Sequence, residues 1–131
     1  MVGKKVVHKT YMSAKEAHYV GGLVNGARIV VQWGDVGTEL MVDVDGDISL
    51  FLGYEKIEFR APVYVGDFME YHGWIETVGN QSYKCRFEAW KVGTQLDRTN
   101  ADLSEVATPE TAATACEPPI LCATGIGSLY I

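Results

Sequence analysis

The sequence predicts a single α+β domain in which an antiparallel sheet wraps around one long helix. Two observations lead to this prediction. Residues 23–42 carry apolar side chains at helical spacing, and the segments after them alternate and are separated by short turns. The chain has 131 residues, of which 47% are hydrophobic and 21% charged. That size and balance fit one globular domain over residues 1–131.

The helix is expected over about residues 23–42. One apolar stripe recurs at intervals of four, three and four residues: Ile29, Trp33, Val36 and Leu40. Asn25 can cap its start. Three glycines weaken it by ~1 kcal/mol each relative to alanine: Gly26, Gly34 and Gly37. A helix that tolerates them is expected to be buried by close packing, and the acidic turn 43–47 ends it.

Strands are expected at the start of the chain and over residues 49–60, 68–78, 82–92 and 120–131. The best alternation lies in 82–92, with inward Tyr83, Cys85, Phe87 and Ala89 between outward Lys84, Arg86, Glu88 and Trp90. Gly79–Asn80 is a typical hairpin turn. Residues 94–119 are rich in Thr, Ala, Pro and acids, which predicts a solvated loop.

Composition excludes several classes of protein. No apolar run is long enough to span a membrane. The net charge of −6, from 11 basic and 17 acidic residues, argues against nucleic-acid or anionic-membrane binding. No apolar segment follows Lys4–Lys5, so we expect no secretory signal, a cytoplasmic location and three reduced thiols: Cys85, Cys116 and Cys122. No metal is expected, because these cysteines and the three histidines do not group as ligands do.

Two short motifs resemble ligand-binding loops and fail on spacing. In the acidic turn 43–47, Gly46 stands at the fourth position of a would-be EF-hand loop instead of the sixth. Gly125–Ile126–Gly127 lies within an expected strand, where it cannot form a nucleotide-binding loop.

A polar stripe on the helix is the strongest chemical signal in the sequence. It recurs at i, i+4, i+7 and i+11: Arg28, Gln32, Asp35 and Glu39. The stripe is either a solvated helix face or, on a buried helix, a set of carboxylates with a task. Asp35 and Glu39 lie within about 6 Å of each other, so one can act as a base while the other provides a stabilising charge.

The sequence also resembles a known family. Residues 22–26 (GLVNG), an acid-bearing helix and residues 57–67 (IEFRAPVYVGD) resemble the hot-dog fold of acyl-CoA thioesterases and dehydratases. Residues 12–19, 33–40 and 61–74 look very like the β-alanyl-CoA:ammonia lyases. The 3-aminobutyryl-CoA ammonia lyases share much of this pattern, less closely in the helix and around Trp74. The resemblance spans nearly the whole chain from Met12, although Glu16 stands where Asp is expected and residues 94–115 fit poorly.

This resemblance implies reversible loss of ammonia from a 3-aminoacyl-CoA, either β-alanyl-CoA or 3-aminobutyryl-CoA. No cofactor is needed, because CoA is part of the substrate. The family places its site between two protomers, which implies at least a homodimer. Outward Trp74 and Trp90 favour a further interface that joins dimers into a larger oligomer, and the alternative is partial cover by the acidic loop.

The reaction assigns tasks to particular residues. Of Asp35 and Glu39, one would be the base and one would hold the substrate ammonium, and the sequence leaves open which. His18 is a secondary catalytic candidate. The other candidates would bind the CoA thioester: Tyr19 before the helix, Asn25 and Gly26 at its N-terminus, Ser82 at the pantetheine arm, and Arg60, Lys84 and Arg86 at the CoA phosphates. Gly26 would let substrate approach closely. For His18 and Tyr19 the alternative is local packing or hydrogen bonding. For Arg60, Lys84 and Arg86, taken singly, a solvated strand face is the more ordinary reading.

Three other functions remain as alternatives. A thioesterase on the same fold would use the carboxylate to activate water against the thioester carbonyl. A non-catalytic domain would bind acyl-CoA unchanged. A structural module would present the polar stripe of the helix to solvent only.

Overall fold

The computed structural model describes residues 2–16, 19–95 and 113–131. One long helix, α1 (Ala27–Asp45), follows the first strand and two short 3-10 turns, Ala14–Glu16 and Val20–Gly22. The five strands are β1 (Lys5–Tyr11), β2 (Phe51–Phe59), β3 (Asp67–Val78), β4 (Ser82–Gln95) and β5 (Ala113–Tyr130). They form one sheet in the order β1-β3-β4-β5-β2, with every neighbouring pair antiparallel.

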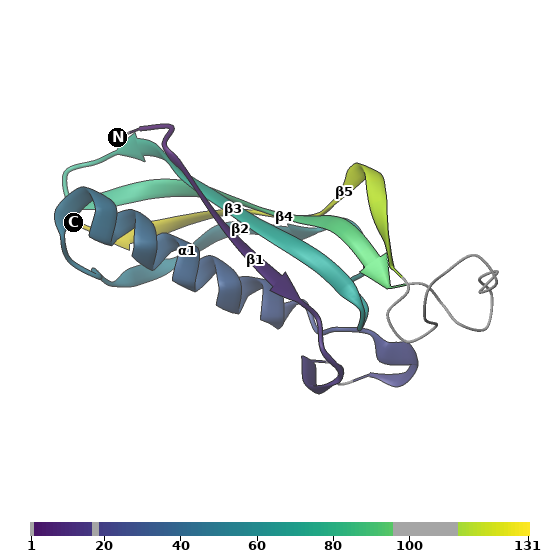
Figure 1. Ribbon diagram of the computed structural model, residues 1–131. Helices are drawn as coiled ribbons and strands as arrows, with labels where there is room; N and C mark the ends of the chain where they lie inside the picture. The colour runs from purple at the N-terminus through teal and green to yellow at the C-terminus, as the bar shows by residue number, and fades with distance from the viewer. Residues whose placement is uncertain (1, 17–18, 96–112) are drawn as a thin grey trace, which may run out of the picture.

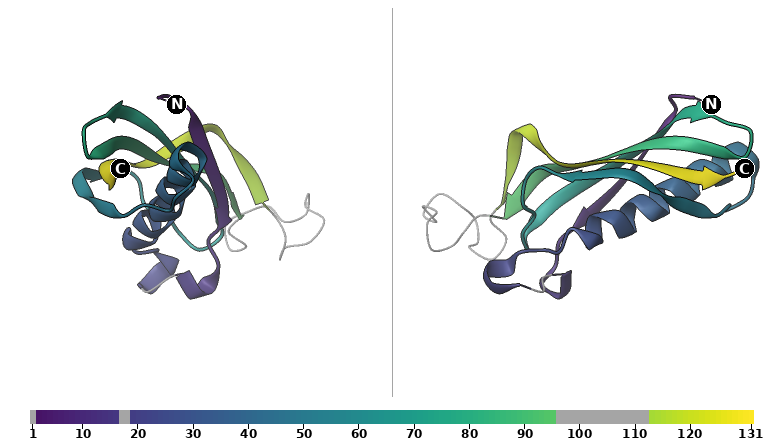
Figure 2. Two further views of the ribbon diagram at one scale, coloured as in Figure 1. Left: turned by 90° about the vertical axis from the view of Figure 1, so that its left-hand side faces the viewer. Right: turned by 180° about the vertical axis from the view of Figure 1, so that it is seen from behind.

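The sheet curls around α1, which lies along its inner face (Figures 1 and 2). The predicted apolar stripe is confirmed, because Ile29, Trp33, Val36 and Leu40 are all buried. The Trp33 indole donates a hydrogen bond to the Glu88 carbonyl at 3.1 Å. A Cβ atom on Gly125 would come within 2.8 Å of the Trp33 ring, and one on Gly127 within 3.0 Å of the Phe51 and Tyr54 rings, so these two glycines leave room for core aromatic rings.

The expected alternation in β4 is also confirmed. The side chains of Tyr83, Cys85, Phe87 and Ala89 are all buried. On β3, Met69, Tyr71 and Ile75 share the inner face as expected. The Tyr71 hydroxyl accepts a hydrogen bond from Thr10 on β1, and burial raises the pKa of Tyr71 to about 12. The sheet and the helix thus share one core.

The helix begins later and ends later than predicted. Leu23 and Val24 are extended: Leu23 bridges Tyr64, and the Val24 N–H donates to the Val63 carbonyl at 2.9 Å. Their apolar side chains therefore belong to a strand-like contact rather than to the helix. At the other end, Gly46 adopts φ 70° and donates its N–H to the Val42 carbonyl, which ends α1 three residues past the expected position 42.

The loop expected at residues 94–119 is shorter at both ends. Residues of β4 continue to pair with the start of β5, from Gly93 opposite Ala115 to Gln95 opposite Ala113. The small polar and alanine side chains here are compatible with a sheet extension, which composition alone does not distinguish from a loop. The remaining residues, 96–112, lie outside the described part of the chain. No described helix has the length and apolar character to span a membrane.

A buried ion pair fixes the connection between β2 and β3. Asp67 is only 2% exposed and lies 3.0 Å from Lys91 Nζ. Its carboxylate also accepts hydrogen bonds from the Thr94 hydroxyl and the Tyr64 N–H. Lys91 donates in turn to the Pro62 carbonyl at 2.9 Å. The connection 60–66 is therefore held in one position beside the start of α1.

Candidate active site

A cavity of about 220 Å³ lies where α1 begins. It is open to solvent on one side and is bounded by the start of the helix, the end of β2 and the connection between β2 and β3. Its walls are Val24, Asn25, Gly26, Ala27, Ile29, Phe59, Ala61, Pro62 and Val63. Asn25 is the one polar side chain in this set, and none of these side chains is charged.

The first backbone N–H groups of α1 are largely satisfied. The Asn25 Oδ1 accepts from the Ala27 N–H at 2.9 Å, so Asn25 caps the helix from one residue before the N-cap, Gly26. Arg28 and Ile29 donate to the carbonyls of Asn25 and Gly26. Within the described residues, the Gly26 N–H has no hydrogen-bond partner. It is the free donor at the positive end of the helix.

Tyr19 and Asn25, two of the predicted substrate-binding residues, are in contact at the start of the helix. Asn25 Nδ2 donates to the Tyr19 hydroxyl at 3.2 Å, and the Tyr19 side chain is otherwise exposed. The space beside Gly26, which we expected substrate to use, is filled by another side chain. A Cβ atom on Gly26 would lie 2.6 Å from Cε1 of Phe59. His18, the neighbouring candidate, falls among the residues that the structure does not describe.

The two helix carboxylates differ in their surroundings. Both are exposed, on the side of α1 that faces away from the core. Glu39 Oε1 lies 3.1 Å from Nε2 of His8 on β1. Asp35 makes no hydrogen bond or ion pair with the described part of the chain. The expectation of a buried helix thus holds for its apolar side and not for the polar stripe.

Charged side chains on the exposed side of α1 form ion pairs with the N-terminal segment. Arg28 lies 3.5 Å from Glu16, and Asp43 lies 3.6 Å from Lys4. With the contact between His8 and Glu39, these pairs run along the gap between α1 and the first strand. Among the described residues, Asp43 and Glu39 each have a basic partner on this side of α1, whereas neither carboxylate oxygen of Asp35 has one.

A single protomer keeps the free donor and the free carboxylate apart. Asp35 follows Gly26 by nine residues, which is a rise of about 13.5 Å along a helix at 1.5 Å per residue. A thioester oxygen and its α-hydrogen are separated by only a few bonds. One chain alone therefore cannot place Gly26 N–H and Asp35 on the same thioester.

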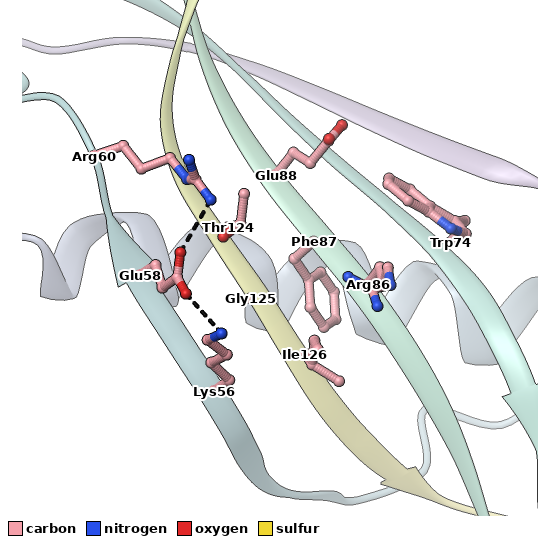
Figure 3. A pocket seen from close by; sticks show the side chains of 10 residues that line it. All are labelled: Lys56, Glu58, Arg60, Trp74, Arg86, Phe87, Glu88, Thr124, Gly125 and Ile126. Carbon is pink, nitrogen blue, oxygen red and sulfur yellow. Dashed lines mark hydrogen bonds and ion pairs between the residues drawn. The ribbon is translucent and has the colours of Figure 1, made fainter.

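The basic candidates lie on the opposite face of the sheet from α1. Arg60 and Arg86 line an outer groove of about 350 Å³, shown in Figure 3 with the helix behind the sheet. Arg60 pairs with Glu58 at 3.0 Å and Arg86 with Glu76 at 2.9 Å. Lys84 pairs with an acid of β2, Glu55, at 3.0 Å. The structure does not bring these three side chains into the cavity at the helix start.

Ser82 also lies away from that cavity. It begins β4, and the hydroxyl of the adjacent Tyr83 donates to Asp45 in the last turn of α1. Ser82 is thus near the C-terminal end of the helix, whereas Asn25 and Gly26 are at the N-terminal end.

Two residues escaped the sequence analysis. His8 contacts Glu39 across 31 positions of sequence, and the alternation of Val6, His8 and Thr10 in β1 was the one available signal. Phe59 is the last residue of β2 and was not among the candidate site residues. Its ring is 58% exposed and reaches across to α1, because β2 ends at this residue.

The buried thiols are poor nucleophiles. Burial raises the pKa of Cys85 to about 12 and also raises the pKa of Cys122. Among the residues that the structure describes, no three His, Cys, Asp or Glu side chains gather as a metal site would require.

Comparison with known proteins identifies the class. The thioesterase superfamily matches residues 21–97. The structure of β-alanyl-CoA:ammonia lyase from Clostridium propionicum is 73% identical, with a TM-score of 0.87 over 100% of this chain and 87% of that chain. The 3-aminobutyryl-CoA ammonia lyase of Acetoanaerobium sticklandii is 46% identical over 118 residues, which are 90% of this chain and 92% of the relative.

A more distant structure shares the fold alone. A hexameric broad-specificity acyl-CoA thioesterase is 19% identical, with a TM-score of 0.72 over 98% of this chain and 81% of that chain. The chain belongs to the thioesterase superfamily and, within it, to the family of the acyl-CoA ammonia lyases. The hot-dog fold, the family and the class of enzyme predicted from the sequence are confirmed.

Proposed function

We propose that this protein is a 3-aminoacyl-CoA ammonia lyase whose principal substrate is β-alanyl-CoA, which it converts reversibly to acrylyl-CoA and ammonia. The unpartnered Asp35 carboxylate, one helical turn from Glu39, is the observation that carries the proposal. The higher identity to the β-alanyl-CoA lyase, 73% against 46% for the 3-aminobutyryl-CoA lyase, favours the smaller substrate.

In the proposed mechanism Asp35 is the base. The thioester acidifies the α-hydrogen, and Asp35 takes it as a proton while negative charge builds on the thioester oxygen. The Gly26 N–H, at the positive end of α1, donates to that oxygen. The C–N bond then breaks, its electron pair leaves with nitrogen as neutral ammonia, and the α,β double bond forms. No acid is needed for the leaving group, because the amine departs from its ammonium form.

Glu39 is proposed to hold the substrate ammonium. It lies one turn from Asp35, so an ammonium at the β-carbon can reach it while Asp35 faces the α-carbon. His8 lies 3.1 Å from Glu39 Oε1 and orients that carboxylate. Asp35, by contrast, has no competing partner. This difference supports the assignment of Asp35 rather than Glu39 as the base.

The separation of donor and base within one protomer supports a homodimer with shared sites. The outer edge of β2 is unpaired among the described residues, and exposed apolar side chains gather on and before this strand: Ile48, Leu50, Leu52 and Phe59. The opposite edge, β1, carries Lys5 and Lys9, which disfavour edge pairing. We propose that two copies associate along β2, and that dimers assemble further, as in the hexameric thioesterase neighbour.

No cofactor is proposed, since the thioester supplies the activation and CoA is part of the substrate. Arg60, Lys84 and Arg86 remain candidates for the CoA phosphates. Each would exchange a carboxylate partner for a phosphate on binding, which costs less than creating a new charge site. A cytoplasmic location is part of the proposal.

The direct test mixes purified protein with acrylyl-CoA and ammonium. Enoyl-thioester absorbance and free thiol are followed together. The proposal predicts loss of absorbance that requires ammonium and releases no thiol. Thiol release without ammonium would identify a thioesterase instead, and no change in either signal would refute the proposed reaction.

A further inference from the structure

We propose that Phe59 determines which 3-aminoacyl group the site accepts, by filling the space that a substituent on the β-carbon would otherwise enter. The inference rests on the proposed function, because it assigns Phe59 a role in the choice between two aminoacyl-CoA substrates. In β-alanyl-CoA this substituent is a hydrogen atom, and in 3-aminobutyryl-CoA it is a methyl group.

The position of the Phe59 ring is unusual for an exposed aromatic side chain. It is 58% exposed at the end of β2, yet its ring packs on the backbone of Gly26. A Cβ atom at position 26 would meet Cε1 at 2.6 Å and Cζ at 2.7 Å. Real side chains do not approach this closely, so a side chain at position 26 would displace the ring, which covers the first turn of α1.

The cavity beside this ring suits an apolar group. Val24, Ile29 and Val63 contribute to its walls with Phe59, and no charged side chain is among them. Its one polar side chain, Asn25, is already bonded to the Ala27 N–H and to Tyr19. A substrate ammonium would lose part of its hydration here without gaining a carboxylate, whereas a hydrogen atom or a methyl group has no such cost.

The free Gly26 N–H connects this cavity to the reacting atoms. The β-carbon is two bonds from the thioester carbonyl carbon. When the thioester oxygen accepts from Gly26 N–H, the β-carbon therefore lies within roughly 7 Å of that nitrogen, counting one hydrogen bond and three covalent bonds. The ammonium must turn toward a carboxylate outside the cavity. Of the two other β-substituents, we assign the one on the helix side to the space beside Phe59, because the ring lies against Gly26.

Substitution of Phe59 tests this role. We compare Phe59→Leu and Phe59→Ala with the wild-type protein, using acrylyl-CoA and crotonyl-CoA with ammonium, and measure kcat/KM for each. The ratio of crotonyl-CoA to acrylyl-CoA should rise by about tenfold or more, with the larger rise in Phe59→Ala, because one methyl group is worth roughly 10- to 200-fold in a fitted pocket. Phe68→Leu is the matched control: Phe68 is a half-exposed aromatic of β3 that packs on Tyr11 and not on the cavity.

The possible outcomes distinguish a failure of this inference from a failure of the proposed lyase function. A wild-type protein that aminates acrylyl-CoA, with the same substrate ratio in both Phe59 variants, would overturn the role of Phe59 and leave the lyase intact. Loss of both activities in both variants, at unchanged melting temperature and unchanged oligomeric state, would also overturn it, since Phe59 would then serve the reaction as a whole. Failure of every protein, wild type included, to aminate either enoyl-CoA would refute the proposed function itself.

Discussion

Asp67 and Asp35 are two aspartates with opposite surroundings in this fold. Asp67 is 2% exposed and holds Lys91, Thr94 and the Tyr64 N–H, so its oxygens are fully engaged. Asp35 is exposed on α1 with no described partner. A carboxylate whose contacts are complete is a structural support, while one left open is available to a substrate. The number of partners, more than burial within one protomer, separates the two roles.

The largest expected effect is on Asp35. We expect Asp35→Asn to lower kcat for ammonium addition to acrylyl-CoA by about 10²- to 10⁴-fold, the usual loss when a general base is removed. Its unfolding midpoint should stay close to that of the wild type, because the Asp35 side chain makes no described contact. Steady-state kinetics with a urea titration checks both parts, and an Asp35→Asn protein with wild-type kcat would contradict the assignment.

Asp67 should show the opposite pattern. Asp67→Ala leaves the Lys91 ammonium without its buried partner, and we expect the free energy of unfolding to fall by about 3 kcal/mol. Urea unfolding monitored by tryptophan fluorescence measures this loss. Replacing both residues, as Asp67→Ala with Lys91→Met, should recover part of the stability. A single Asp67 variant as stable as the wild type would mean that the ion pair contributes nothing.

Glu39 and His8 should give intermediate effects on binding. Glu39→Gln removes the charge proposed for the substrate ammonium, so KM for β-alanyl-CoA should rise by about tenfold while KM for acrylyl-CoA changes little. His8→Gln should change both constants less, since the exposed pair is worth at most about 1 kcal/mol. Equal increases of KM for both CoA esters in Glu39→Gln would argue against an ammonium-binding role.

The smallest effect concerns the thiols. Cys116 is partly exposed, whereas Cys85 and Cys122 are buried in the sheet. At pH 8, one thiol per chain should react quickly with a disulfide reagent. Because the pKa of Cys85 is raised to about 12, raising the pH toward 10 should still leave it mainly as an unreactive thiol. Rapid modification of all three cysteines in the folded protein would contradict the packing of β4 on α1.

Sequence periodicity predicted the elements whose burial follows one face. The stripe from Ile29 to Leu40 and the alternation from Tyr83 to Ala89 both appear as expected, because each has a regular repeat against one core. The predicted start of the helix was wrong, because Leu23 and Val24 are apolar like the helix that follows but pair with the chain near Val63. Composition carries no information on such a long-range partner.

The candidate site was predictable in its residue types and less so in its arrangement. The spacing of Asp35 and Glu39 indicated a carboxylate pair on one helix face. That His8 engages Glu39 and leaves Asp35 open depends on how β1 lies beside α1, which is a tertiary contact. The same holds for Phe59, whose position over Gly26 depends on where β2 ends. Local patterns cannot encode either relation.

The most direct test of the account measures whether solvent hydrogen is incorporated at the α-carbon of the product. Acrylyl-CoA and ammonium are incubated with the wild-type protein in D₂O, the protein is removed, and the β-alanyl-CoA product is examined by mass spectrometry after return to H₂O. If Asp35 delivers the proton to the α-carbon, the product carries one deuterium that does not wash out, and Asp35→Asn forms this product far more slowly. Free CoA in place of that product, or an undiminished rate in Asp35→Asn, would contradict the account.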